Sequence, residues 1–97
     1  MNTHELLKQA EEVQRRMKSE LPTTFAEVSV GGGMVSVTMD GHRHLTEVKI
    51  EADAADPDDP GMIEDLIVAA VNEANRKIDE TVQQKVGSMA PNIPGLF

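Results

Sequence analysis

The feature of the sequence that most constrains its fold is a change of hydrophobic period, from helical to strand-like and back. Residues 24–50 alternate apolar and polar side chains, which is typical of β-strands. Residues 3–21, which Pro22 ends, and residues 62–86 instead repeat apolar side chains every three or four positions, which is typical of helices. The pattern therefore predicts an α+β fold in the order helix, three antiparallel strands, long helix (α-β-β-β-α).

Two glycine-containing segments divide the predicted strands. Residues 31–33 are three consecutive glycines, and Asp40-Gly41 is a strong signal for a two-residue hairpin turn. Such a turn would place Met39 opposite His42. One face of the sheet is then rich in valine, and the other carries three large apolar side chains, those of Phe25, Met34 and Leu45.

Helix and strand lengths do not match in this chain. The helix predicted over residues 62–86 spans about 37 Å, whereas strands of six residues span about 20 Å. The helix is apolar along one side as far as its end, so a single copy would leave part of that side in water. We therefore expect residues 1–86 to form one domain that pairs as a homodimer, through Phe25, Met34, Leu45, Val82 and Val86. Residues 87–97 are rich in Gly and Pro, which predicts a flexible tail.

The net charge of −8 argues against binding to nucleic acid, because such proteins usually carry a basic face. The charge is unevenly distributed, however. Residues 51–61 hold five acidic and no basic residues, whereas residues 1–21 are neutral. Any binding to DNA is therefore expected to be local, weak and sensitive to salt, with the acidic loop away from the DNA.

Several functional classes are excluded by what the sequence lacks. There is no cysteine, and hence no disulfide, thiolate zinc site or thiol nucleophile. The first 12 residues lack the apolar segment of a signal peptide, and no apolar run approaches the ~20 residues of a membrane span, which predicts a cytoplasmic protein. No phosphate-binding loop, nucleophile elbow or zinc-protease motif is present. We expect no enzyme activity and no cofactor.

Two short patterns resemble metal sites. The acidic segment 53–64 has the length of a calcium loop, but Asp58 stands where that loop needs glycine. Its carboxylates are better explained by the positive end of the following helix. His42 and His44 could hold zinc weakly together with Asp40, but no third close ligand is evident, and an exposed hairpin tip is the favoured interpretation. No metal site is predicted.

The first predicted helix carries a short basic stripe. Lys8, Arg15 and Lys18 share one face, because seven residues make nearly two helical turns. The stripe could contact phosphates, or it could be a solvated face whose arginines pair with neighbouring glutamates. Composition alone favours the second interpretation.

The sequence resembles the YbaB/EbfC family along nearly its whole length. The resemblance is carried by LKQA at 7–10, GMVSVT at 33–38, VKI at 48–50 and PGLF at 94–97. Its most specific part is IEDLIVAAVNEA at 63–74.

This resemblance implies a tweezer-like homodimer that binds double-stranded DNA and belongs to the bacterial nucleoid. It also implies roles in nucleoid organisation, gene regulation or recombinational repair, with repair proteins as further partners. The family places its DNA contacts on helical arms, which makes seven basic residues the candidates here: Lys8, Arg15, Arg16, Lys18, Arg76, Lys77 and Lys85. One departure is Pro22, which stands where the family usually continues a longer and more basic first helix.

A second hypothesis is a protein-binding module. Small acidic α/β dimers without catalytic motifs also resemble secretion chaperones, which hold an extended partner on an apolar face. The long apolar helix and the six methionines would then form the binding surface, and the protein would not bind DNA. The family resemblance favours DNA.

Overall fold

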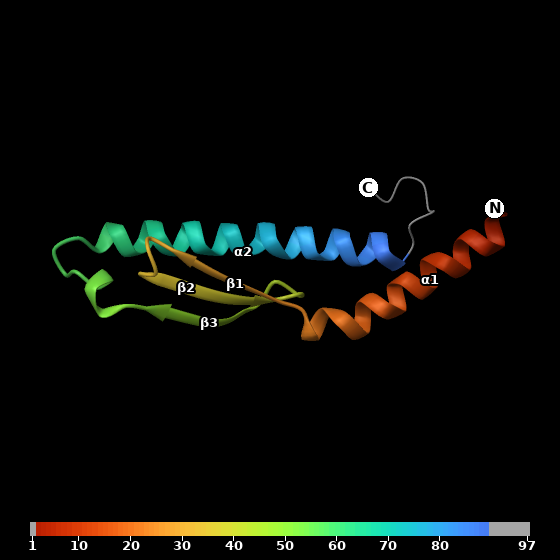
Figure 1. The fold of residues 1–97 in the computed structure, drawn as a ribbon, viewed down its shortest axis with the longest axis horizontal. Helices are drawn as coiled ribbons and strands as arrows, with labels where there is room; N and C mark the ends of the chain where they lie inside the picture. The colour runs from red at the N-terminus through yellow and green to blue at the C-terminus, as the bar shows by residue number, and fades with distance from the viewer. Residues whose placement is uncertain (1, 90–97) are drawn as a thin grey trace.

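The computed structural model describes residues 2–89, with side chains for residues 2–88. Its elements are α1 (Thr3–Glu20), the 3₁₀ turn η1 (Leu21–Thr23), β1 (Phe25–Val30), β2 (Val35–Asp40), β3 (Leu45–Ile50), the 3₁₀ turn η2 (Ala52–Ala54) and α2 (Pro60–Met89). The predicted α-β-β-β-α order is confirmed (Figure 1). Helix α2 continues past Val86 to Met89, so the predicted tail begins later than expected. Residues 90–97 of that tail lie outside the described residues.

Both ends of α1 are capped by side chains. At its start, the Asn2 side chain accepts a hydrogen bond from the Glu5 amide at 2.8 Å. At its end, the hydroxyls of Thr23 and Thr24 donate to the Glu20 carbonyl at 3.0 and 2.8 Å. The chain then turns through Pro22 in η1 and enters the sheet. These hydrogen bonds fix the point at which α1 leaves the rest of the fold.

The three strands form one antiparallel sheet in the order β1-β2-β3. The β1–β2 register places Val28 opposite Val37 and Val30 opposite Val35. The turn between these strands contains the three glycines at 31–33, whose φ angles are 63°, 67° and 95°. L-residues with side chains rarely adopt such angles, which explains why this turn is built from glycine.

The predicted two-residue turn between β2 and β3 is wrong. Val37 pairs with Val48, and Met39 pairs with Leu45, so the turn is longer and a register shift follows Thr38. The longer turn is stabilised by Asp40, whose Oδ1 accepts from the amides of residues 42 and 44 at 2.9 and 3.0 Å. An aspartate that satisfies two turn amides competes with the tighter hairpin.

Helix α2 packs across β1 and β2 and leaves β3 uncovered. The core contains the inward-facing residues of both strands and one side of the helix: Ala26, Val28, Val35, Val37, Met39, Ala70, Ala74 and Ile78. All six residues of β3 are exposed, including Val48 and Ile50 at 44% and 42%. A single protomer therefore keeps an apolar, unpaired sheet edge in water.

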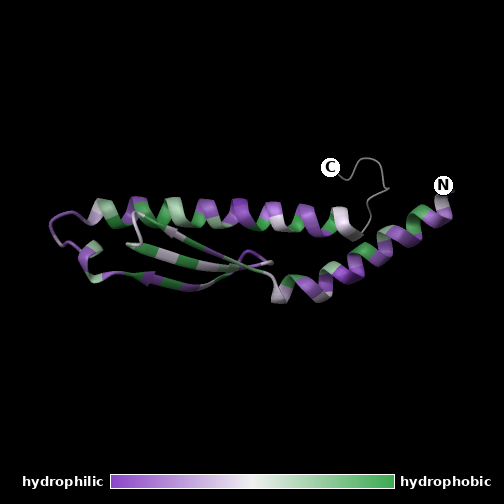
Figure 2. Ribbon diagram, in the orientation of Figure 1, coloured by the Kyte–Doolittle hydropathy of each residue, from purple (hydrophilic) through white to green (hydrophobic). Residues whose placement is uncertain are grey.

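The molecule is elongated, with principal extents of 64 × 21 × 16 Å. Its radius of gyration is 18.1 Å, against about 12–13 Å for a compact chain of this length. Helix α2 overruns the sheet as expected, and α1 projects beyond the sheet as an arm (Figure 1). No side chain of α1 is buried, although apolar residues recur along it (Figure 2). None of the helices in the described part of the chain could cross a membrane.

Candidate nucleic-acid interface

Helix α1 is amphipathic, and its polar face carries the predicted basic stripe. Lys8, Arg15 and Lys18 are all exposed there. Arg15 and Arg16 both lie close to the Glu12 carboxylate, at 3.6 and 3.5 Å. Within residues 2–89, Lys8 and Lys18 form no ion pair, so these two ammonium groups are available to an external anion. The structure thus supports both interpretations of the stripe in part, because the arginines are paired and the lysines are not.

The predicted cations on α2 are less available. Arg76 is held by Glu73 at 2.5 Å and by Glu80 one turn further on. Hydrogen bonding to Glu73 and the charges of both glutamates raise the pKa of Arg76, and Arg76 in turn lowers the pKa of Glu73. Its charge is therefore balanced twice over within the helix. Lys77 lies 3.5 Å from the backbone carbonyl of Glu27.

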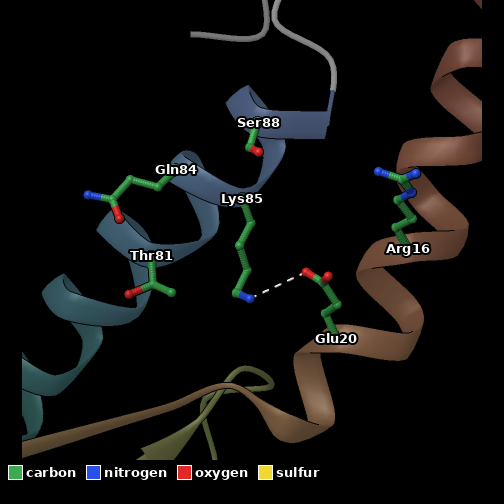
Figure 3. A pocket seen from close by; sticks show the side chains of 6 residues that line it. All are labelled: Arg16, Glu20, Thr81, Gln84, Lys85 and Ser88. Atoms are coloured by element: carbon green, nitrogen blue, oxygen red, sulfur yellow. Dashed lines mark hydrogen bonds and ion pairs between the residues drawn. The ribbon is translucent and has the colours of Figure 1, made fainter.

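Lys85 links the two helices. Its Nζ lies 3.3 Å from the Glu20 carboxylate at the end of α1 (Figure 3). This pair lies in a hollow of about 420 Å³ between α1 and α2. The lining residues are Arg16, Glu20, Thr81, Gln84, Lys85 and Ser88. Two of the seven predicted DNA-contacting residues, Arg16 and Lys85, thus meet at one place, which their distance in the sequence did not predict.

The sequence profile of the YbaB/EbfC DNA-binding family matches residues 1–93. This chain belongs to the YbaB/EbfC DNA-binding family. Relatives named "Nucleoid-associated protein" include one from Chloroflexus aurantiacus, 35% identical over the full length of both chains. Another, from Acetivibrio thermocellus, is 43% identical and covers 99% of this chain and 90% of its own. A third, from Shouchella clausii, is 48% identical over 80% of this chain and 76% of its own.

A solved structure shares the fold of this YbaB/EbfC member. The crystal structure of an uncharacterized protein from Helicobacter pylori superposes with a TM-score of 0.69 at 22% identity. The match covers 81% of this chain and 92% of the other. The elongated α-β-β-β-α arrangement is therefore also found in a more distant chain.

The acidic loop of this YbaB/EbfC protein lies far from the arm. Residues 51–61 connect β3 to the start of α2, at the opposite end of the molecule from α1 (Figure 1). Two of its aspartates are arranged within the loop itself, since Asp56 accepts from the Asp58 amide at 2.9 Å. The negative charge of the loop is thus separated from the basic stripe by much of the 64 Å long axis.

The five predicted interface residues do not form one patch within the protomer. Phe25 and Leu45 are exposed at one end of the sheet, whereas Met34 is half-buried at the other. Val82 packs against the core, and Val86 is half-buried further along α2. Their role in pairing stays a prediction.

The histidine turn holds no cluster of metal ligands. His42 and His44 have ring centroids 6.2 Å apart, while Asp40 Oδ1 is occupied by backbone amides. Within the described residues, no three His, Cys, Asp or Glu side chains gather at one point. Sequence reasoning instead missed the residue between them. Arg43 binds Asn75 and Asp79 of α2, and no local sequence signal announces contacts over 32 and 36 residues.

Proposed function

We propose that this protein is a nucleoid-associated homodimer that binds double-stranded DNA in the bacterial cytoplasm. Membership of the YbaB/EbfC DNA-binding family supports DNA as the ligand, and the names of the relatives support the nucleoid as its location. The observation that carries the proposal is the polar face of α1. On an arm that projects from the sheet, this face presents Lys8 and Lys18, without ion-pair partners among the described residues, beside Arg15.

Dimerisation is supported by apolar surface that one protomer cannot cover. Leu6 and Leu7 are exposed on α1, and Val48 and Ile50 are exposed on β3. Phe25 is 56% exposed at the end of the sheet. Contiguous apolar surface of this kind is typical of protein interfaces. A homodimer would also double the number of basic arms. Light scattering at micromolar concentration tests this, with twice 10.6 kDa expected and the monomer mass contradicting it.

The mechanism is neutralisation of backbone phosphates by the arms. Each phosphate contact lowers the slope of log affinity against log salt by about 0.9. Few cations per protomer are unpaired, and the net charge is −8, so binding is expected to be weak and strongly salt-dependent. The described surface offers no recognisable motif for reading base edges, which favours binding without strong sequence preference.

The deciding experiment compares two charge-matched double variants. Lys8→Gln/Lys18→Gln removes the two lysines of the stripe, and Lys49→Gln/Arg76→Gln removes two cations that already hold carboxylate partners. Fluorescence anisotropy with a 30-base-pair duplex, at several salt concentrations, measures affinity and slope. We expect the first variant to lose affinity and to show a flatter slope, by about 0.9 for each phosphate contact removed. The second should stay close to the wild type.

The exposed edge strand β3 keeps the protein-binding alternative open to the same test. An extended partner could add a strand there, since Val48 and Ile50 are exposed and the edge is unpaired within the protomer. Absence of duplex binding at low salt would contradict the DNA proposal and favour this one. Equal affinity loss in both double variants would contradict the arm as the contact surface.

A further inference from the structure

The hollow between α1 and α2 has the chemistry of an anion site with one exception. Five of its six lining side chains can donate hydrogen bonds to an anion: Arg16, Thr81, Gln84, Lys85 and Ser88. The sixth, Glu20, is the only carboxylate, and it holds Lys85 at 3.3 Å. Figure 3 shows Arg16 and Glu20 projecting from α1 toward α2, with Lys85 reaching back to Glu20.

We propose that this cleft binds a backbone phosphate of DNA and that Glu20 acts as a built-in competitor for Lys85. The proposal rests on the proposed function, because it concerns how the same interface is regulated. In the free protein the Glu20 carboxylate takes the place of the phosphate. When DNA binds, Lys85 exchanges one anion for the other.

The composition of the cleft favours phosphate as the ligand. Arginine, lysine and hydroxyl side chains are the usual donors to phosphate oxygens, and contacts to a charged acceptor are stronger than neutral ones. Lys85 is half-buried, so its ammonium group is poorly solvated and needs an anionic partner. Glu20 meets that need in the absence of DNA. The cleft lies against the end of α1, whose last carbonyls add partial negative charge and further weaken a phosphate while Glu20 is present.

The side chain of Glu20 is separable from its structural role. Its backbone carbonyl accepts the hydroxyls of Thr23 and Thr24 at 3.0 and 2.8 Å, and these bonds do not involve the carboxylate. Glu20→Gln therefore removes the competing charge while the cap at the end of α1 remains. The same holds for Lys85→Gln, which removes the cation from an ordinary helical position.

The test is a double-mutant cycle read by DNA affinity. Wild type, Glu20→Gln, Lys85→Gln and the double variant are titrated against a labelled 30-base-pair duplex between 50 and 200 mM salt. Glu5→Gln is the matched control, because it makes the same charge change on the same helix without an ion-pair partner among residues 2–89. Circular dichroism confirms that each variant is folded.

We expect Glu20→Gln to bind more tightly than Glu5→Gln and with a steeper salt slope. Two additional phosphate contacts in a dimer steepen the slope by about 1.8, which corresponds to roughly tenfold more affinity lost between 50 and 200 mM salt. In the Lys85→Gln background this gain should disappear, because the cation that Glu20 competes for is gone. The small gain from Glu5→Gln should remain in either background.

The alternatives give different results. A gain from Glu20→Gln that equals the Glu5→Gln gain, or that persists without Lys85, would show a general charge effect and overturn the competitor role. Wild-type binding that depends on the α1 lysines together with such a result would leave the proposed function standing and remove only this inference. No binding by the wild type or by Glu20→Gln at 50 mM salt would overturn both.

Discussion

Arg43, in the turn between β2 and β3, is tied by an ion pair to Asp79 in the middle of α2. The same guanidinium donates to the backbone carbonyl and the side-chain oxygen of Asn75, at 3.3 and 3.0 Å. One side chain thus fixes the hairpin tip against two successive turns of the helix. Arg43 has a φ of 67°, which an L-residue adopts at some cost, so these contacts also hold the turn in a strained conformation.

Replacement of Arg43 by Gln should destabilise the protein by about 1 kcal/mol. Both partners of the ion pair are more than one third exposed, so the pair itself contributes only a few tenths, and the hydrogen bonds to Asn75 supply the rest. Urea unfolding measures the loss. In a cycle with Asp79→Asn we expect a coupling of about 0.5 kcal/mol. Lys49→Gln, whose partner Glu47 is a neighbour on the same strand, should cost less; strict additivity of Arg43 and Asp79 would contradict the clamp.

Gly41→Ala should destabilise the protein by about 1–3 kcal/mol. A Cβ at this position would lie 2.5 Å from the carbonyl oxygen and 2.9 Å from the Cα of Leu21. Those are backbone atoms, so the junction between α1 and the sheet must move. The Gly41 amide also donates to that carbonyl at 3.2 Å. Gly61→Ala is the control, since its nearest neighbour would be 3.8 Å away in the first turn of α2, and it should be neutral or slightly stabilising. Equal effects would show that the contact with Leu21 is unimportant.

The sequence predicted the elements well because hydrophobic period is a local signal. The change of period located all three strands, and Pro22 located the end of α1. The turn after β2 was predicted too short, because the Asp40-Gly41 pair suggests a tight hairpin. What decides the turn is the Asp40 side chain binding the amides of His42 and His44. Choosing between these alternatives requires the energies of both turns, which a dipeptide signal does not contain.

The candidate site was predictable only as a set of cations. Local spacing indicated that Arg15 could pair on its own helix, and it lies beside Glu12. The Glu20–Lys85 pair spans 65 residues and depends on the angle at which α1 meets α2. That angle is set by the η1 turn and by the close approach of Gly41 to Leu21, and neither contact follows from helical period.

Ile78→Ala should destabilise the protein by about 2–5 kcal/mol, far more than the truncation of an exposed side chain. Ile78 is fully buried between α2 and the sheet, at the centre of the core. Ile78→Val should cost about 0.5–1.5 kcal/mol, since it removes one methylene. Val68→Ala on the same helix should stay within about 0.5 kcal/mol, because Val68 is 60% exposed. Chemical unfolding gives all three values, and a large loss at Val68 would show that its surface is covered in solution.

Asp40 should make the stability of the protein depend on acidic pH. The His44 amide is the main cause that lowers the pKa of Asp40 below its ordinary value of 3.8, with further contributions from the His42 amide and the two imidazoles. A lowered pKa in the folded state stabilises the protein above the unfolded pKa, and this contribution is lost as the pH falls through the folded pKa.

Asp40→Asn removes that dependence while keeping the size of the side chain. The wild type should be the more stable of the two at pH 6, and the difference should shrink as the pH falls below about 3.8. Urea midpoints from pH 6 to pH 2.5 measure this difference. Asp53→Asn in the acidic loop serves as the control for loss of a carboxylate without turn amides bound to it. A difference between wild type and Asp40→Asn that stays constant down to pH 2.5 would mean that the carboxylate charge does not stabilise the turn, and the longer hairpin would then have to be held by the Arg43 contacts with α2.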